Sequence, residues 1–284
     1  DSRCSGSGSY PYADYMGETW SDPIVTRIRV TVGGDDNSGA GYERWVAIVA
    51  GGYSEEGDPN MPTSYDSSSD ASTSREGRAV FVIDVQTGEL IAMKRFSHDA
   101  NQGDPRMQFA LAATPAVFDL NFDGYADVVY LGDLGGNLWK WVISSPAELP
   151  ATGSVITDAD LDQSAWSWIR LVEVDHCEFD SASPSVCPVD HYRSIFFPPT
   201  GALIRGVLWL AFGTGERNQL DFAGYPDGTQ ENNRFYVLKD LDPWEKSSSG
   251  TPTEARYNDF VGSPDFVPVD LASTCDYPAA PEVG

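Results

Sequence analysis

"DVVYLGDLGGNLWKWVI", residues 127–143, contains two short apolar runs separated by a turn with two adjacent glycines. Each run is too short for a typical helix and is rich in Val, Tyr and Trp, which suit a pleated, half-buried surface. A glycine in the connection supplies the positive φ that a tight hairpin turn requires. The stretch therefore predicts a strand, a tight turn and a second strand.

The same pattern occurs upstream in "RAVFVIDVQTGELIAMKRF", residues 78–96. The central aspartates of the two hairpins, Asp84 and Asp133, lie 49 residues apart. A hairpin unit that recurs at about 40 to 50 residues is typical of β-propeller blades. Further strands are expected at 44–53, 167–174, 206–215 and 234–241. The prediction is an all-β protein, a β-propeller that is either complete or else modified or incomplete, with long loop insertions.

Polar insertions separate the predicted strands at residues 54–77, 146–165 and 175–193. Residues 1–241 are interpreted as one propeller domain. Residues 242–284 lose the strand rhythm, so we expect an irregular C-terminal tail that packs on the propeller. Because the chain starts at Asp1 rather than at a methionine, we expect a processed or partial product.

The chain is strongly acidic. It has 284 residues, 43 of them acidic and 18 basic, for a formal net charge of −25. Such a surface repels nucleic acid, because binding phosphate needs clustered Lys and Arg. It attracts divalent cations and favours solubility outside the cell. No stretch approaches the roughly 20 apolar residues that cross a bilayer, so no membrane span is expected.

The four cysteines predict disulfides and an oxidising compartment, because their number is even and their contexts are loop-like. None of them forms a CxxC motif, so the sequence contains no zinc-ribbon site, no thioredoxin-like redox motif and no c-type haem attachment site. We expect Cys177 to pair with Cys187 and Cys4 to pair with Cys275. The alternative is four buried free thiols.

"DLNFDGYAD", residues 119–127, places an oxygen-bearing side chain at every second position and a glycine at the sixth. Calcium takes six to eight hard oxygen ligands, and its loops commonly alternate ligands in this way around a bend glycine. Three carboxylates so close together repel one another unless a cation lies among them. The expected ligands are the side chains of Asp119, Asn121, Asp123 and Asp127 and the main-chain carbonyl of Tyr125.

The loop differs from an EF-hand in two respects. Position 12 is Tyr130, so the usual bidentate glutamate is missing and Asp127 has to supply that carboxylate. Its flanks are strand-like rather than helical. The alternative is a solvated acidic turn, and magnesium suits the site less well because it prefers rigid octahedral geometry. "DADLD", residues 158–162, lacks the bend glycine and is expected to be a solvated loop.

The order of the motifs resembles the C-terminal propeller of PilY-type proteins, which are tip-associated adhesins and assembly factors of type IV pili. The resemblance spans about residues 19 to 241, and "DLNFDGYADVVYLGDLGGNLWKW" is its most specific part. The other pieces, in order, are "TWSDPIVTRI", "WVAIVAGGYSEE", "GRAVFVIDVQTGELI", "FFPPTGALI", "LWLAFGTGER" and "NNRFYVLKD".

The resemblance implies a function as well as a fold. The family's propeller carries a calcium loop of the same form, so the five residues named above are implied as Ca²⁺ ligands. Calcium occupancy is tied in the family to pilus extension and retraction. The implied partners are pilin or minor pilin subunits and a host or abiotic surface, and the implied location is the pilus tip at the bacterial cell surface. The family's large N-terminal region is not found in these 284 residues.

Other functions agree less well with the sequence. A structural, filament-associated protein without an adhesive role is one alternative. A quinoprotein-like dehydrogenase is another, since residues 82–91 carry an aspartate followed by Thr-Gly, but the expected tryptophan and adjacent cysteines are absent. A metal pair formed by His176 and His191, and a sugar site lined by tryptophans, are weaker than ordinary loop and packing roles. We predict no catalytic residues and no enzymatic activity.

Overall fold

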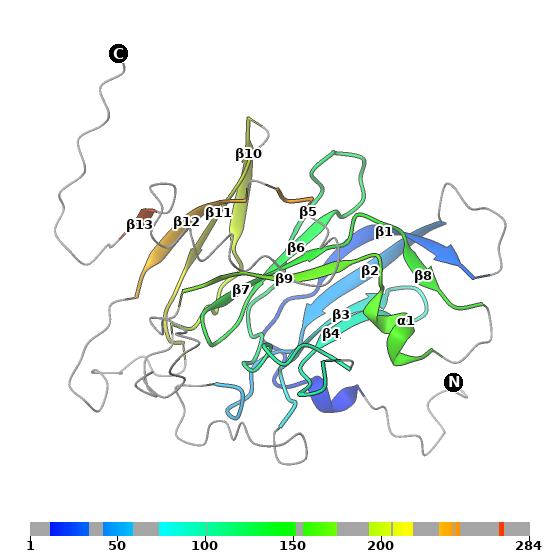
Figure 1. Ribbon diagram of the computed structural model, residues 1–284, viewed down its shortest axis with the longest axis horizontal. Helices are drawn as coiled ribbons and strands as arrows, with labels where there is room; N and C mark the ends of the chain where they lie inside the picture. The colour runs from blue at the N-terminus through cyan, green and yellow to red at the C-terminus, as the bar shows by residue number, and fades with distance from the viewer. Residues whose placement is uncertain are drawn as a thin grey trace.

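The molecule is built from successive antiparallel β-sheets (Figure 1). The computed structural model describes residues 12–33, 42–58, 74–100, 102–151, 156–174, 193–205, 207–217, 233–240, 242–244 and 267–269. Within these ranges the strands form three sheets, here called sheets one, two and three in chain order. In Figure 1, sheet three lies at the left, sheet two in the middle and sheet one at the right.

Sheet one is a meander of four antiparallel strands, to which β8 adds in parallel beside β1. Its strands alternate buried and exposed side chains, as in β2, where Val46, Ile48 and Ala50 point into the core. The strands are β1 (Ile24–Val32), β2 (Tyr42–Ala50), β3 (Ala79–Asp84), β4 (Leu90–Arg95) and β8 (Ala147–Leu149). A short 3₁₀ turn, Ala13–Tyr15, precedes them.

Sheets two and three repeat the four-stranded antiparallel meander. Sheet two consists of β5 (Ala116–Phe118), β6 (Val128–Gly132), β7 (Asn137–Val142) and β9 (Ser167–Glu173). Sheet three consists of β10 (Thr200–Ile204), β11 (Val207–Gly213), β12 (Phe235–Asp240) and β13 (Val267–Val269). The single-turn helix α1 (Asp158–Asp162) lies between β8 and β9 in the chain.

Three consecutive four-stranded meanders are the pattern of β-propeller blades. The predicted all-β class is therefore confirmed, and the described strands build an incomplete propeller, because propellers typically have four to eight blades. Both predicted hairpins are present, as β3–β4 and β6–β7. They occupy different places in their sheets, however, since β3–β4 are the third and fourth strands and β6–β7 the second and third. The 49-residue spacing therefore does not join equivalent positions.

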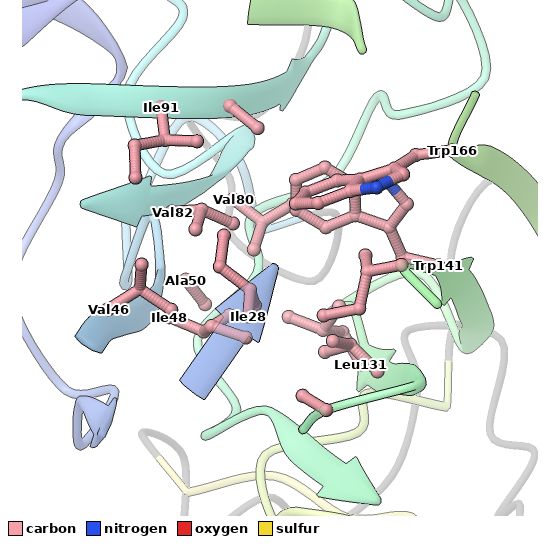
Figure 2. Close-up of a cluster of buried hydrophobic side chains, with 14 of the residues drawn as sticks. Ile28, Val46, Ile48, Ala50, Val80, Val82, Ile91, Leu131, Trp141 and Trp166 are labelled. Carbon is pink, nitrogen blue, oxygen red and sulfur yellow. The ribbon is translucent and has the colours of Figure 1, made fainter. Parts of the chain in front are cut away.

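The core between sheets one and two is apolar and contains several indole rings (Figure 2). Trp139 and Trp168 stack with ring centroids 5.1 Å apart, and Trp141 meets Trp166 edge to face at 5.5 Å. These tryptophans therefore serve packing, as expected. The other main contributors are Ile28, Val46, Ile48, Val80, Val82 and Ile91 from sheet one and Val129 and Leu131 from sheet two.

Sheet two is buried on both faces. All residues of β6 and β7 are buried, and alternate side chains point in opposite directions. Val129 and Leu131 join the core with sheet one, whereas Val128 and Tyr130 join a second core with sheet three. That second core also contains Leu208, Leu210, Phe212, Tyr236 and Leu238. Stacking three sheets face to face thus leaves the middle sheet without a solvent side.

The structure bears on several other sequence predictions, with different outcomes. "DADLD" forms α1 rather than the predicted solvated loop, because Thr157 and Asp160 make a capping box that stabilises one helical turn. Residues 267–269 of the tail add β13 to sheet three, while the domain division itself stays a prediction. All four cysteines lie outside the described residues. Among the residues that the structure describes, no helix is long and apolar enough to cross a membrane.

Candidate calcium site

The acidic loop joins β5 to β6 at the end of sheet two. β5 ends at Phe118, and its carbonyl accepts a hydrogen bond of 2.9 Å from the N–H of Asp127, which closes the loop. The N–H of Ala126 donates to the carbonyl of Arg27 on β1, at 2.8 Å. The loop is therefore held at the place where sheet two meets sheet one.

A left-handed bend turns the chain in the middle of the loop. Gly124 has φ of +87°, and a Cβ built at this position would lie 2.2 Å from Nη2 of Arg27. The conformation therefore favours glycine, as predicted from its sixth position, and a larger residue would also have to displace the end of the Arg27 side chain. Phe122 also has positive φ, at 62°, and its side chain is 79% exposed. A phenylalanine rarely adopts this conformation, so the bend carries local strain.

The loop's own N–H groups compensate two of its acids. The carboxylate of Asp119 accepts from the N–H groups of Asp123, at 3.2 Å, and Gly124, at 2.7 Å. The buried carboxylate of Asp127 accepts from the N–H groups of Leu120, at 2.7 Å, and Asn121, at 3.4 Å. Burial raises the pKa of Asp127, and the charges of Asp119 and Asp123 add to this, while the two N–H donors act in the opposite direction.

The third acid, Asp123, is compensated by an arginine from the other sheet. Its Oδ2 accepts from Nη2 of Arg29 at 2.9 Å and from Nδ2 of Asn121 at 3.1 Å, and its Oδ1 accepts from the N–H of Tyr125 at 3.0 Å. Burial raises the pKa of Asp123, but the donors from Tyr125, Arg29 and Asn121 together hold it below its usual range.

Two arginines on β1 surround the loop, and the sequence prediction missed both. Nε of Arg27 donates to the carbonyl of Gly124 at 3.0 Å. The guanidinium of Arg29 lies 4.3 Å from the ring centroid of Tyr125, whose hydroxyl donates to Oε2 of Glu43 at 3.3 Å. A signal existed: Arg27 and Arg29 are two residues apart in "IVTRIRVTV", which places both on one face of a strand.

The donor set fits a hard cation. The five predicted ligand residues lie in one loop and offer carboxylate, amide and carbonyl oxygens, which are the ligands that Ca²⁺ takes. Within the described ranges, however, no three Asp, Glu, His or Cys side chains are grouped so as to hold a metal ion. In the arrangement seen, N–H groups and Arg29 occupy the carboxylate oxygens. Oδ2 of Asp123 therefore has Arg29 as a partner in this arrangement.

The remaining sequence candidates have structural partners or lie outside the described residues. Asp158 of α1 pairs with Arg95 at 2.9 Å, and Asp162 pairs with Lys94. These contacts fasten α1 to β4, so the acids of "DADLD" serve capping and ion pairing. His176 and His191 lie outside the residues that the structure describes.

Comparison with known proteins identifies a consistent set of relatives, although no family model matches the chain. The type IV pilus biogenesis factor PilY1 homolog of Xylella fastidiosa is 35% identical over 135 residues, which cover 46% of this chain. PilY1 of Pseudomonas aeruginosa strain UCBPP-PA14 is 27% identical over 156 residues, or 53% of this chain. The chain spans only 7% and 10% of the lengths of these two relatives.

A solved structure is also similar. The crystal structure of the Pseudomonas aeruginosa PilY1 C-terminal domain aligns with 83% of this chain and 40% of its own, at 20% identity and a TM-score of 0.45. The sequence relatives bear the same name as the family that the motifs resemble. Over the segment that it shares with them, this chain is therefore similar to PilY-type proteins.

Proposed function

We propose that this chain is the calcium-binding β-propeller module of a type IV pilus biogenesis factor, without enzymatic activity. The observation that carries the calcium part is the loop 119–127, which gathers five oxygen-donor residues around a glycine bend at the junction of two sheets. The pilus part is supported by the relatives named PilY1.

The chain's own residues prepare the loop for a cation. N–H groups hold the carboxylates of Asp119 and Asp127 in the loop, and Gly124 provides the bend that brings residues 119 and 127 together. Asn121 and the carbonyl of Tyr125 complete the oxygen set. A bound Ca²⁺ supplies positive charge that offsets the mutual repulsion of the acids. Because Arg27 fastens the loop to β1, occupancy acts on the contact between sheets one and two.

Calcium titration of the purified chain, monitored by calorimetry, tests the site. Asp123→Ala removes one of three carboxylates and is expected to weaken binding by about tenfold or more, because affinity follows the number of charged ligands. Asp14→Ala removes an exposed acid in the 3₁₀ turn Ala13–Tyr15 and is expected to leave affinity unchanged. Equal affinities for the wild type and Asp123→Ala would exclude the loop as the site.

A bound cation should also stabilise the fold, since a ligand that binds only the native state raises the free energy of unfolding with its concentration. The unfolding temperature of the wild type is expected to rise with added Ca²⁺, and that of Asp123→Ala much less. Magnesium at equal concentration should have a smaller effect, because Mg²⁺ prefers near-octahedral geometry and keeps several of its waters. A rise that is equal in both proteins would point to binding elsewhere on the acidic surface.

The pilus role is tested separately. We propose pilin or minor pilin subunits as the partners and the pilus tip at the cell surface as the location, with a further role in surface adhesion. Co-purification of the chain with pilin subunits, compared with and without Ca²⁺, is expected to recover the complex. Self-assembly of the purified chain into fibres, with no pilin recovered, would favour the structural filament protein instead.

A further inference from the structure

The structure places a positive charge from a different sheet on one of the proposed calcium ligands. Nη2 of Arg29, on β1 in sheet one, lies 2.9 Å from Oδ2 of Asp123 in the loop of sheet two. The same guanidinium lies 4.3 Å from the ring centroid of Tyr125, the residue proposed to offer its carbonyl. Arg29 therefore contacts two of the five proposed ligand residues, although it is 94 residues from Asp123 in the chain.

We propose that Arg29 is a built-in competitor for calcium, which neutralises Asp123 when the ion is absent and is displaced when the ion binds. This inference rests on the proposed function of the loop. It assigns a regulatory role to a residue of β1 that sets how much calcium is needed to fill the site.

The contacts of Asp123 indicate that Arg29 competes with a cation for this carboxylate and does not assist its binding. Both of its oxygens already have partners, Oδ1 with the N–H of Tyr125 and Oδ2 with Arg29 and Asn121. A guanidinium and a divalent cation on one carboxylate also repel each other. A cation that takes Oδ2 of Asp123 therefore competes with Arg29 for this oxygen.

Arg27 has a different task, although it is two residues away on the same strand. Its Nε donates to the carbonyl of Gly124 and its Nη1 lies 3.3 Å from Oε2 of Glu43. The Arg27 guanidinium also lies 5.3 Å from the ring centroid of Tyr125, but neither of its two hydrogen-bonding partners is a side chain proposed to bind the ion. Arg27 can therefore hold the loop on β1 whether or not a cation is bound. Arg29 is thus the residue of this pair whose contact with an acid changes when calcium binds. Through this contact, calcium binding to the loop of sheet two affects β1 in sheet one.

The test compares calcium affinities of variants by calorimetry at low ionic strength. Arg29→Gln is expected to bind Ca²⁺ about two- to fivefold more tightly than the wild type, the range that an exposed ion pair permits. Arg44→Gln is the matched control: it removes the same charge from the neighbouring strand β2, and both arginine side chains are 37% exposed. Its affinity is expected to equal that of the wild type.

A second variant and a second readout keep the outcome clear. Arg29→Lys retains the charge and is expected to stay close to wild-type affinity. In chelator, Arg29→Gln should lower the unfolding temperature, and Ca²⁺ should raise it by more than in the wild type. Unchanged or weaker binding by Arg29→Gln, while the wild type binds, would overturn the competitor role alone. No binding by the wild type would overturn the proposed calcium site, and the competitor role with it.

Discussion

Lys140 and Asp240 form an ion pair in the fully buried contact between sheets two and three. Nζ of Lys140 on β7 lies 2.8 Å from Oδ2 of Asp240 at the end of β12, and neither side chain is exposed. The hydroxyl of Tyr130 donates to the same carboxylate oxygen at 2.7 Å, and Nζ of Lys140 also donates to the carbonyl of Asp242 at 2.6 Å. Each charge is thus satisfied, which is the condition under which a buried pair is tolerated.

Removing one partner of this pair should be far more damaging than removing both. Asp240→Leu leaves an uncompensated buried ammonium and is expected to lower the free energy of unfolding by about 3–5 kcal/mol, measured by urea denaturation. The double variant Lys140→Met with Asp240→Leu should lose much less than the sum of the single changes. As a control, Asp162→Asn breaks a pair whose acid is 68% exposed, and should change stability by less than about 1 kcal/mol. Additive losses would contradict a coupled pair.

The bend of the acidic loop should be sensitive to a single methyl group. Gly124→Ala places an alanine at φ of +87° and its Cβ against Arg27, so we expect a loss of roughly 1–2 kcal/mol or more and weaker calcium binding. Gly88→Ala is the comparison, because Gly88 has φ of +74° but nothing within 4 Å of the added Cβ. Thermal denaturation should show a larger loss for Gly124→Ala. Equal losses would mean that Arg27 moves aside freely.

Stability should depend on pH through Asp133, which lies in the β6–β7 turn. Its buried carboxylate accepts from the indole N–H of Trp139 at 2.8 Å and from the N–H groups of Gly135 and Asn137. Burial raises the pKa of Asp133 to about 7, although these donors lower it. The native state therefore holds a proton that the unfolded state has released between pH 3.8 and about 7. Across that window, this residue's contribution to stability falls as pH rises.

The variant Asp133→Asn separates this contribution from that of the many other acids. Its amide cannot titrate, so the decline of up to about 1.4 kcal/mol per pH unit should disappear from the comparison with the wild type. The amide N–H₂ also faces N–H donors, so the variant should be less stable at every pH. Unfolding free energies at several pH values measure both effects. Parallel curves for the two proteins would show that Asp133 does not titrate in this range.

The core between sheets one and two should depend on Leu131, which is fully buried on β6 (Figure 2). Leu131→Ala is expected to destabilise the protein by about 2–5 kcal/mol, because it removes apolar contacts and leaves a cavity. Val25→Ala, at a side chain that is 56% exposed on β1, should change stability by less than about 0.5 kcal/mol. Urea denaturation distinguishes the two.

The strands that the sequence predicted are those with long apolar runs. β2, β3, β4, β6, β7, β9, β11 and β12 all fall within or next to predicted segments. β1 was not predicted as a strand although "IVTRIRVTV" alternates polar and apolar side chains from Arg27 to Val32, which indicates a half-buried strand; the prediction relied on continuous apolar runs, and this segment has none. β8 and β13 have three residues each, too few for a pattern to stand out. Length and continuity thus decided which strands could be found.

The candidate site was predictable in its local part only. Gly124, the alternating oxygens and the strand-like flanks could be read from nine consecutive residues. The contact of Asp123 with Arg29 joins residues that are 94 positions apart, and nothing in the local sequence indicates it. The crowding of three acids in the sequence predicts a cation among them. In the structure, N–H groups and an arginine already provide part of that compensation.

The two-sided burial of β6 has a consequence for how the strand finds its alignment. Ordinarily a one-residue slip is prevented because it would turn apolar side chains into water, but here both directions lead into apolar surroundings. The acids at the two ends offer another constraint. Asp127 holds the N–H of Leu120 before the strand, and Asp133 holds the N–H of Asn137 after it. A shift of β6 by one residue would break both hydrogen bonds at once, so these aspartates help to fix the register of the strand in sheet two.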